Sequence, residues 1–204
     1  MSNKLPNLDI EKKFLNQGLI CGIDEVGRGS LAGPVVAAAV ILNFNNIPLG
    51  INDSKNINKV KRHILYEKII DVSKNVAFGE SSTQEIDKLN ILNASLLAMK
   101  RAYYNLSIKA EIALVDGNFS PTIKCNVFNI IKGDSKSLSI AAASIIAKVY
   151  RDNILKSLDK KFPKYNFKNN AGYGTKEHYA AINKFGISPY HRKSFKLYKQ
   201  KEEN

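Results

Sequence analysis

The chain has 204 residues, enough for one domain with a substantial hydrophobic core. Apolar residues make up 44% and charged residues 24%, and no apolar run reaches the ~18 residues that a membrane-spanning helix needs, so we expect no membrane association. Lys and Arg number 31 against 18 Asp and Glu, a net charge of +13. Such an excess favours a polyanionic partner such as nucleic acid, although a Lys-rich surface explains the charge equally well.

Residues 1–13 are polar and lack the apolar core of a secretory signal. Cys21 and Cys125 do not have the spacing of a metal site, so we expect free thiols in a reducing compartment, the cytoplasm. His63, His178 and His191 likewise lack the spacing of a zinc site.

The first half of the chain alternates between apolar runs and helical patterns. Residues 19–23 and 35–42 predict buried strands, joined as a hairpin by the glycines and proline between them. Polar residues 52–55 offer N-caps for a helix whose apolar positions are Val60, Ile64, Leu65, Ile69 and Ile70. Residues 76–79 predict a short strand. Residues 81–83 with Glu85 predict a helix start, after which apolar residues recur at helical spacing as far as Tyr103.

The second half continues this alternation. Residues 112–115 and 127–131 predict strands, and residues 137–162 predict a long helix closed by Pro163. A last helix is expected over residues 176–184, ending at Gly186. A hairpin followed by alternating strands and helices predicts an α/β domain with a mixed sheet. The segment from about residue 164 is richer in Lys, Tyr and Asn, which suggests a small helical appendage.

Three acidic sites lie at the ends of predicted strands: Asp24 with Glu25, then Asp116, then Asp134. Functional groups gather at strand ends in α/β sheets. Four carboxylates suit a hard divalent ion such as Mg²⁺ or Mn²⁺, and two such ions ~3.5–4 Å apart are a common device for phosphodiester cleavage. The alternative is that Asp24 pairs with Arg28 and Glu25 is solvated.

Neighbours on a regular strand point to opposite faces, so Asp24 and Glu25 should not both reach one site. We therefore expect the strand to break or bulge at these two residues, beside the turn formed by Gly27, Arg28 and Gly29.

Residues 24–29, running into residues 31–40, resemble the opening motif of the ribonuclease HII family. Further segments match that family in order: 53–55, 115–118, 132–134 continuing through 139–152, 172–175 and 191–195. The matches span nearly the whole chain. Ser30 and Ser135 depart from the family's usual proline and alanine, and neither change removes a charged group.

The resemblance implies a ribonuclease-H-like fold, a mixed central sheet flanked by helices. Residues 1–163 would form the catalytic domain and residues 164–204 a helical extension that contacts substrate. The implied activity is hydrolysis of the RNA strand of RNA–DNA hybrids and cleavage 5′ of single ribonucleotides in duplex DNA. Two Mg²⁺ or Mn²⁺ ions would assist in-line attack of water, leaving 3′-hydroxyl and 5′-phosphate ends. The role would be ribonucleotide removal in DNA replication and repair, by a monomer.

The resemblance also assigns residues. Asp24, Glu25, Asp116 and Asp134 would be the catalytic, metal-binding acids. Gly27, Arg28 and Gly29 would read the ribose 2′-hydroxyl, the group that distinguishes RNA from DNA, together with the neighbouring phosphate. Tyr173 would stack on the sugar at the ribonucleotide–deoxyribonucleotide junction. Lys55 is a candidate phosphate contact, with a solvated lysine as the alternative.

Other polar residues are less specific. Ser144, Lys148, Arg151 and Asp152 form a stripe on the long helix, which fits a solvated face with a Lys–Asp pair as well as a role beside the site. Basic and aromatic residues near the C-terminus suit a duplex backbone; they are Lys160, Lys161, Lys164, Tyr165, Lys168, Tyr173, Lys176, His191, Arg192, Lys193 and Lys196. A non-catalytic nucleic-acid-binding module and a DNA nuclease of the same fold are the rival functions.

Overall fold

The computed structural model describes residues 5–198. Five strands form one sheet in the order β3-β2-β1-β4-β5. Their bounds are β1 Ile20–Val26, β2 Val35–Ile41, β3 Asn75–Ser81, β4 Ile112–Asp116 and β5 Asn126–Ile130. β1, β4 and β5 run parallel, whereas β2 is antiparallel to both β1 and β3. The predicted hairpin and the mixed α/β sheet are therefore confirmed.

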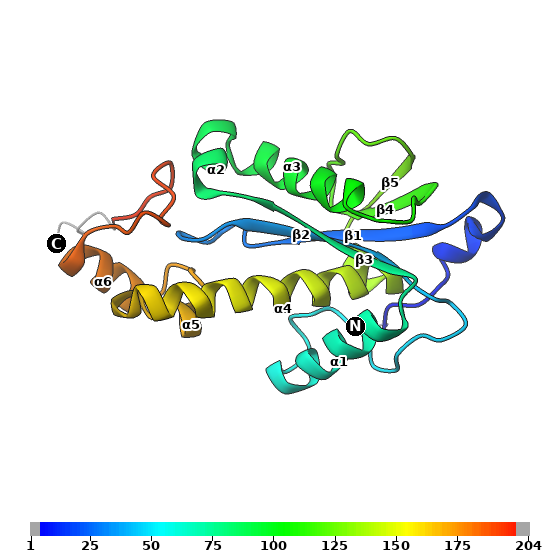
Figure 1. Cartoon of the computed structure of the whole chain (residues 1–204), viewed down its shortest axis with the longest axis horizontal. Coiled ribbons are helices and arrows are strands. Elements are labelled where there is room, and N and C mark those ends of the chain that lie inside the picture. The colour runs from blue at the N-terminus through cyan, green and yellow to red at the C-terminus, as the bar shows by residue number, and fades with distance from the viewer. Residues whose placement is uncertain (1–4, 199–204) are drawn as a thin grey trace.

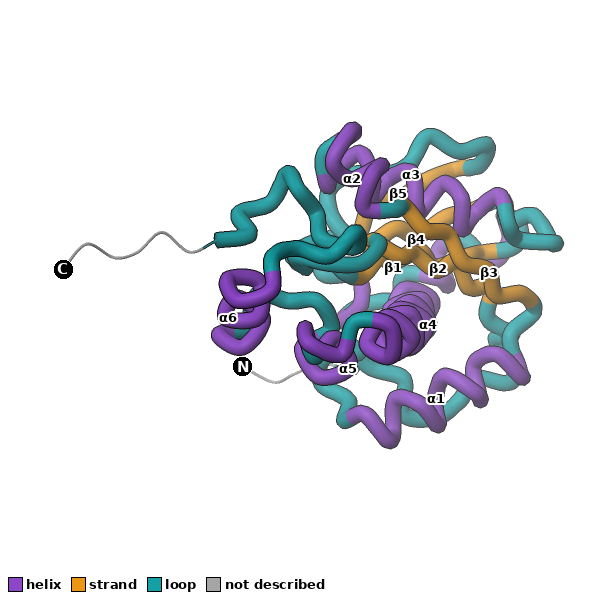
Figure 2. Tube along the Cα trace, turned by 60° about the vertical axis from the view of Figure 1, so that its left-hand side comes forward, coloured by secondary structure: helices purple, strands orange, loops and turns teal. Residues whose placement is uncertain are grey.

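Helices cover both faces of this sheet. They are α1 Lys59–Val72, α2 Thr83–Leu89, α3 Ile91–Tyr104, α4 Leu138–Lys161, α5 Phe167–Asn170 and α6 Lys176–Phe185. α2 and α3 lie over one face and α4 over the other, with α1 packed beyond α4 (Figures 1 and 2). Short 3₁₀ turns complete the chain at Glu11–Lys13, Leu15–Gln17, Gly133–Ser135 and Pro163–Tyr165.

Capping residues set most helix ends. The Ser82 side chain accepts from the Glu85 backbone N–H, and the Glu85 carboxylate accepts from the Ser82 N–H, so the predicted start of α2 is a capping box. The helical pattern is then interrupted at Asn90, whose φ of +67° ends α2 and starts α3. Ser137 caps α4, and Pro163 follows its last turn as expected.

The predicted start of α1 was wrong. Its N-cap is Asn58, whose side chain accepts from the Lys61 N–H, and residues 52–55 form a loop instead. Of the five apolar positions predicted for its buried face, only Leu65 and Ile69 are buried, and Val60 is 71% exposed. The reason is that α1 lies at the margin of the sheet and packs mainly against α4, so it buries only a narrow stripe.

The segment after Pro163 packs on the body of the domain. Tyr165 and Phe167 share a hydrophobic cluster with Leu31 and Ala32 of the hairpin turn and with Leu155 of α4. Three residues expected to face a duplex, Tyr165, His191 and Arg192, are fully or almost fully buried, so that part of the prediction was wrong. The division of function at residue 163 stays a prediction.

α4 lies so close to β1 that only glycine fits at position 22. A Cβ on Gly22 would lie 2.1 Å from the backbone of Ser139, the second residue of α4. This close approach fixes the helix on the strand that carries Asp24 and Glu25.

We expect Gly22→Ala to lower the free energy of unfolding by about 1–3 kcal/mol, because the added methyl group overpacks this contact. Urea denaturation with an unchanged m-value measures the change. Gly29→Ala is the control, since a Cβ there would meet only the Tyr173 ring at 3.9 Å. Equal stabilities for the two variants would contradict the conclusion that the close contact with Ser139 requires glycine at position 22.

Candidate active site

β1 does not break at its two acids. It pairs with β2 through Asp24↔Ala38, Glu25↔Ala37 and on to Val26, so the predicted break or bulge was wrong. On the other side, its pairing with β4 ends at Ile23↔Val115. Beyond Ile23, β1 is therefore paired on its β2 side and unpaired on its β4 side. At this unpaired side, side chains from both faces of β1 can reach the same space.

That space is a cavity of about 400 Å³ lined by all four acids. Asp24 and Glu25 come from β1, Asp116 ends β4, and Asp134 lies in the 3₁₀ turn after β5. The backbone N–H of Gly133 donates to Asp116 Oδ1 at 2.6 Å, which ties this turn to β4. Chain segments far apart in sequence thus supply one cluster of carboxylates.

Burial and repulsion from neighbouring acids raise the pKa of three of these carboxyls, Asp24, Glu25 and Asp134. Burial raises the pKa of Asp24 well above its usual range, and Glu25, Asp116 and Asp134 raise it further. Burial also raises the pKa of Glu25, although Arg28 opposes this, and it raises the pKa of Asp134 together with Asp53 and Asp116. The folded chain therefore concentrates negative charge that a cation would stabilise.

Two cationic side chains engage the cluster at its rim. Arg28 lies 3.3 Å from Glu25, and the exposed Lys55 lies 3.6 Å from Asp134. The alternative pairing of Arg28 with Asp24 is therefore not what the structure shows.

The donor set suits a hard divalent ion, because every candidate ligand is a carboxylate oxygen. Glu25 Oε2 is buried and has no hydrogen-bond partner, as expected of an atom that awaits a ligand. Within residues 5–198, no three Asp, Glu, His or Cys side chains lie close enough together to hold a metal ion as they stand. An incoming ion would have to draw the carboxylates together and displace the ammonium and guanidinium groups.

The other predicted site residues adjoin the acids. Tyr173 and Lys55 line the same cavity. Gly27, Arg28 and Gly29 do not line it, but a Cβ on Gly29 would be 3.9 Å from the Tyr173 ring. Gly27 has a φ of +94°, and a Cβ there would lie 2.2 Å from Arg151 Nε, so the turn requires glycine.

Two buried arginines hold this turn, whereas the sequence pattern suggested a polar helix face for Arg151 and a duplex contact for Arg192. Arg151 donates to the carbonyls of Pro34, Ala32 and Ala171 at 2.9–3.0 Å. Arg192 donates to those of Gly33 and Arg28 at 2.9–3.0 Å. Both side chains are fully buried. Backbone carbonyls thus accept the hydrogen bonds of two charged guanidiniums beneath the Gly27–Gly33 segment.

The polar stripe on α4 divides between its two interpretations. Lys148 and Asp152 form the expected pair at 2.8 Å, and Arg151 is buried rather than solvated. Ser144 lines the cavity and shares a 3.0 Å hydrogen bond with Ser54, which links α4 to the 52–58 loop. Arg62, which the sequence analysis missed, donates to the Ser54 carbonyl at 2.9 Å and steadies that loop.

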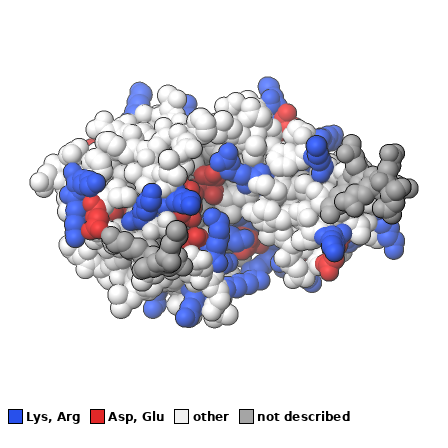
Figure 3. All heavy atoms as spheres, turned by 180° about the vertical axis from the view of Figure 1, so that it is seen from behind, with Lys and Arg blue, Asp and Glu red and all other residues white. Residues whose placement is uncertain are grey.

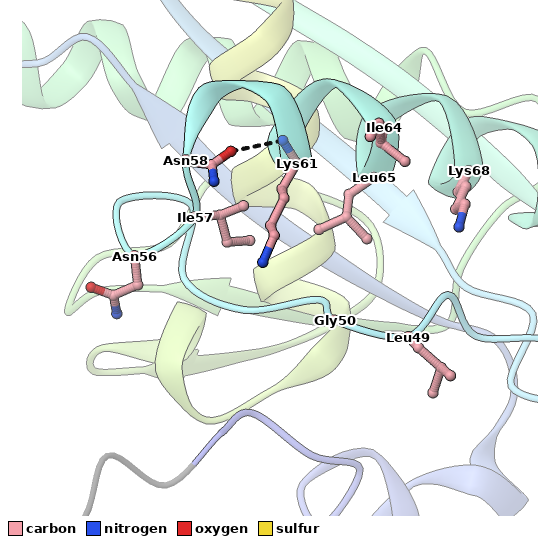
Figure 4. A pocket seen from close by; sticks show the side chains of 9 residues that line it. All are labelled: Leu49, Gly50, Asn56, Ile57, Asn58, Lys61, Ile64, Leu65 and Lys68. Carbon is pink, nitrogen blue, oxygen red and sulfur yellow. Dashed lines mark hydrogen bonds between the residues drawn. The ribbon is translucent and has the colours of Figure 1, made fainter.

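A second hollow, of about 500 Å³, lies between the 49–58 loop and α1 (Figure 4). Its lining is apolar apart from two lysines, two asparagines and backbone, and includes no carboxylate, histidine or cysteine. It lacks the groups for metal or acid–base chemistry.

Across the face seen in Figure 3, Lys and Arg surround Asp and Glu gathered near the middle.

Comparisons with known proteins identify the family. The family model of ribonuclease HII matches residues 21–198. The chain belongs to the ribonuclease HII family. A ribonuclease HII of Rickettsia bellii (strain OSU 85-389) is 55% identical over 188 residues, covering 92% of this chain and 94% of that protein.

Solved structures agree on the fold. The PCNA:RNase HII complex from Archaeoglobus fulgidus matches with a TM-score of 0.76 and 26% identity over 89% of this chain and 97% of that one. Bst-RNase HIII in complex with Mn²⁺ matches with a TM-score of 0.72 and 19% identity over 88% of this chain and 67% of that one. The predicted ribonuclease-H-like α/β fold is confirmed.

As a member of this family, the chain is a metal-dependent endoribonuclease that acts on the RNA of RNA–DNA hybrids. A purely non-catalytic binding module is therefore excluded. Among the described residues, no helix is both long and apolar enough to cross a membrane.

We expect Asp24→Asn to stabilise the metal-free enzyme. The folded-state pKa of Asp24 is raised, so the unfolded chain loses this proton first as pH rises. The wild type and the variant should have equal free energies of unfolding below about pH 4, near the pKa of an aspartate in the unfolded chain. Their free energies of unfolding should then diverge to about 0.5–2 kcal/mol at pH 7.

Denaturation in a chelating buffer across pH 4–8 measures this difference. Added Mn²⁺ should stabilise the wild type more than the variant, because only a bound ion shifts the folding equilibrium. A difference that does not vary with pH would contradict the electrostatic explanation.

Arg192→Lys should lower the free energy of unfolding by about 2–4 kcal/mol. The Arg192 guanidinium donates two hydrogen bonds to the Gly33 carbonyl and one to the Arg28 carbonyl. The compact ammonium group of a lysine cannot span both carbonyls, so a buried carbonyl is left without a partner. Lys193→Ala, which alters an exposed neighbouring side chain, should change stability by less than about 0.5 kcal/mol. Thermal or urea unfolding of the two variants makes the comparison.

Proposed function

We propose that this enzyme cuts on the 5′ side of single ribonucleotides embedded in duplex DNA, in addition to cutting RNA–DNA hybrids. The observation that carries the proposal is the convergence of four carboxylates on one cavity that Tyr173 also lines. Acids alone fit many nucleases. An aromatic ring and a Gly-Arg-Gly turn beside them favour a site that examines a sugar before cutting.

Asp24, Glu25, Asp116 and Asp134 are the proposed ligands of two divalent ions, Mg²⁺ or Mn²⁺. The Mn²⁺ in the related ribonuclease HIII supports this choice, as does the all-oxygen donor set. When bound, such ions lower the pKa of an attacking water and stabilise the leaving oxygen. The four carboxylates would hold the ions beside the phosphate to be cut.

Recognition of the substrate falls to the neighbouring loops. Without side chains, Gly27 and Gly29 let their backbone groups approach a 2′-hydroxyl. Arg28 can leave Glu25 for a phosphate, which it can bind bidentately. Tyr173 is 38% exposed and offers its ring to the sugar at the junction. Lys55 is placed to contact a second phosphate once an ion has taken its place beside Asp134.

Water would attack phosphorus in line and leave a 3′-hydroxyl and a 5′-phosphate. Residues 164–204 would contact the duplex beyond the cut. The +13 charge supports binding to such a polyanion. We further propose that the enzyme works as a monomer in the cytoplasm, in ribonucleotide removal during DNA replication and repair.

A DNA duplex with one ribonucleotide tests the proposal. With Mg²⁺ or Mn²⁺ we expect a single cut 5′ of the ribonucleotide, mapped on a sequencing gel. Asp134→Asn should lower kcat at least about a hundredfold, because ligand loss removes several kcal/mol of transition-state stabilisation. Asp71→Asn, which alters an exposed acid on α1, should leave kcat unchanged.

An all-DNA duplex of the same sequence should remain intact. Cutting it at the same rate would identify a DNA nuclease instead. Full activity of Asp134→Asn would remove that residue from the proposed ligand set.

A further inference from the structure

Two histidines outside the cavity touch each other in the protein interior. His178 is on α6 and His191 follows it, and both are buried. Their Nε2 atoms lie 3.0 Å apart. Neither imidazole lines the cavity of the four acids, so neither is placed for proton transfer to substrate.

The contacts at either end fix which atom of each ring carries a proton. Two groups of Ser188 face His191 Nδ1, the backbone N–H at 2.9 Å and the hydroxyl at 2.8 Å. The hydroxyl can donate or accept, but the backbone N–H can only donate, so this nitrogen accepts. A neutral His191 therefore carries its proton on Nε2 and donates to His178 Nε2. His178 must then be protonated on Nδ1, which lies 2.9 Å from the Tyr173 carbonyl, an obligate acceptor.

The chain of hydrogen bonds therefore runs in one direction, from Ser188 through both imidazoles to Tyr173. An extra proton has no place in it: it would set two N–H groups against each other across the 3.0 Å contact, or one against the Ser188 N–H. Each of these arrangements breaks a hydrogen bond.

The surroundings keep the pair neutral. Burial lowers the pKa of both histidines, and with repulsion from His178 it lowers that of His191 to about 4. The Tyr165 ring packs against both imidazoles, the Tyr173 and Ser188 backbones face the two outer nitrogens, and the guanidinium of Arg192 follows His191 in the chain.

The segment of residues 188–192, which contains His191, also holds the Gly27–Gly33 segment. His191 pairs with Ala32 as a β-bridge, and the Gly33 N–H donates to the Tyr190 carbonyl at 2.9 Å. The Gly172 carbonyl accepts from the Leu31 N–H at 2.7 Å. The imidazole pair thus spans from the Gly27–Gly33 segment to the carbonyl of Tyr173.

We propose that His178 and His191 are positioning residues, which set Tyr173 at its working distance from the Gly27–Gly29 turn through a neutral hydrogen-bond relay. This inference rests on the proposed function in one respect, that Tyr173 contacts the substrate sugar. Neither histidine touches substrate.

Two amide substitutions separate the ends of the relay. The amide of His178→Asn reaches the position of Nδ1 and can still donate to Tyr173, whereas that of His178→Gln reaches only the position of Nε2. We expect His178→Gln to raise KM for a single-ribonucleotide duplex about tenfold, the factor for one lost hydrogen bond, with a smaller change in kcat. His178→Asn should rescue KM to within about threefold, and His63→Gln on α1 is the control.

A double-mutant cycle removes the effect of simple destabilisation. In a Tyr173→Ala background, His178→Gln should have no further effect on KM, because the ring that it positions is gone. The same tenfold rise in that background, or equal damage from the Asn and Gln variants, would overturn the proposal.

Nitrogen-15 NMR of the imidazoles tests the relay without substrate. At pH 7 we expect a protonated Nδ1 in His178 and a protonated Nε2 in His191, with His63 as the reference. A His178 protonated on Nε2 would overturn the relay. Failure of the wild type to cut beside a ribonucleotide would instead count against the proposed function.

Discussion

Four carboxylates share one cavity, and their mutual repulsion is the constraint that the surrounding structure must overcome. Arg28 and Lys55 form their ion pairs with Glu25 and Asp134 rather than with the more deeply buried Asp24. Such charges stay together only on a rigid frame. β1 supplies it by keeping its pairing with β2 as far as Val26 while α4 lies directly against it. Stability is thereby given up for a site that attracts cations.

The Gly27–Gly33 segment, which we propose to contact the substrate, is held by the opposite charge. Arg151 and Arg192 are buried beneath it, and backbone carbonyls rather than carboxylates are their partners. Carbonyl dipoles satisfy the N–H groups without cancelling the net charge. The underside of the turn therefore remains electropositive, which favours a phosphate on its outer side. The guanidinium forks also fix carbonyls that are distant in sequence, so the turn keeps its shape without regular secondary structure.

Sequence reasoning succeeded where local chemistry decides the outcome. The capping box at Ser82, the proline after α4 and the apolar run of β2 each depend on near neighbours, and each was predicted. It failed where tertiary contacts decide. Several acceptable caps precede Lys59, namely Asn52, Asp53, Ser54, Asn56 and Asn58, and local chemistry alone does not single out Asn58, the one that the helix uses. Nothing in the spacing of charges marks Arg151 and Arg192 as buried, because their partners are backbone atoms.

The same limit applies to the acids. Alternation correctly places Asp24 and Glu25 on opposite faces of β1, and the error lay in requiring the strand itself to break. The neighbouring strand ends instead, so the sheet edge opens and both side chains enter one space. A chain of net charge +13 then attracts a polyanion at long range, while the acidic cavity repels a phosphate at short range. A divalent ion between them removes that repulsion. We therefore expect duplex binding and metal binding to be coupled by charge, because without the ion the four acids would repel the scissile phosphate.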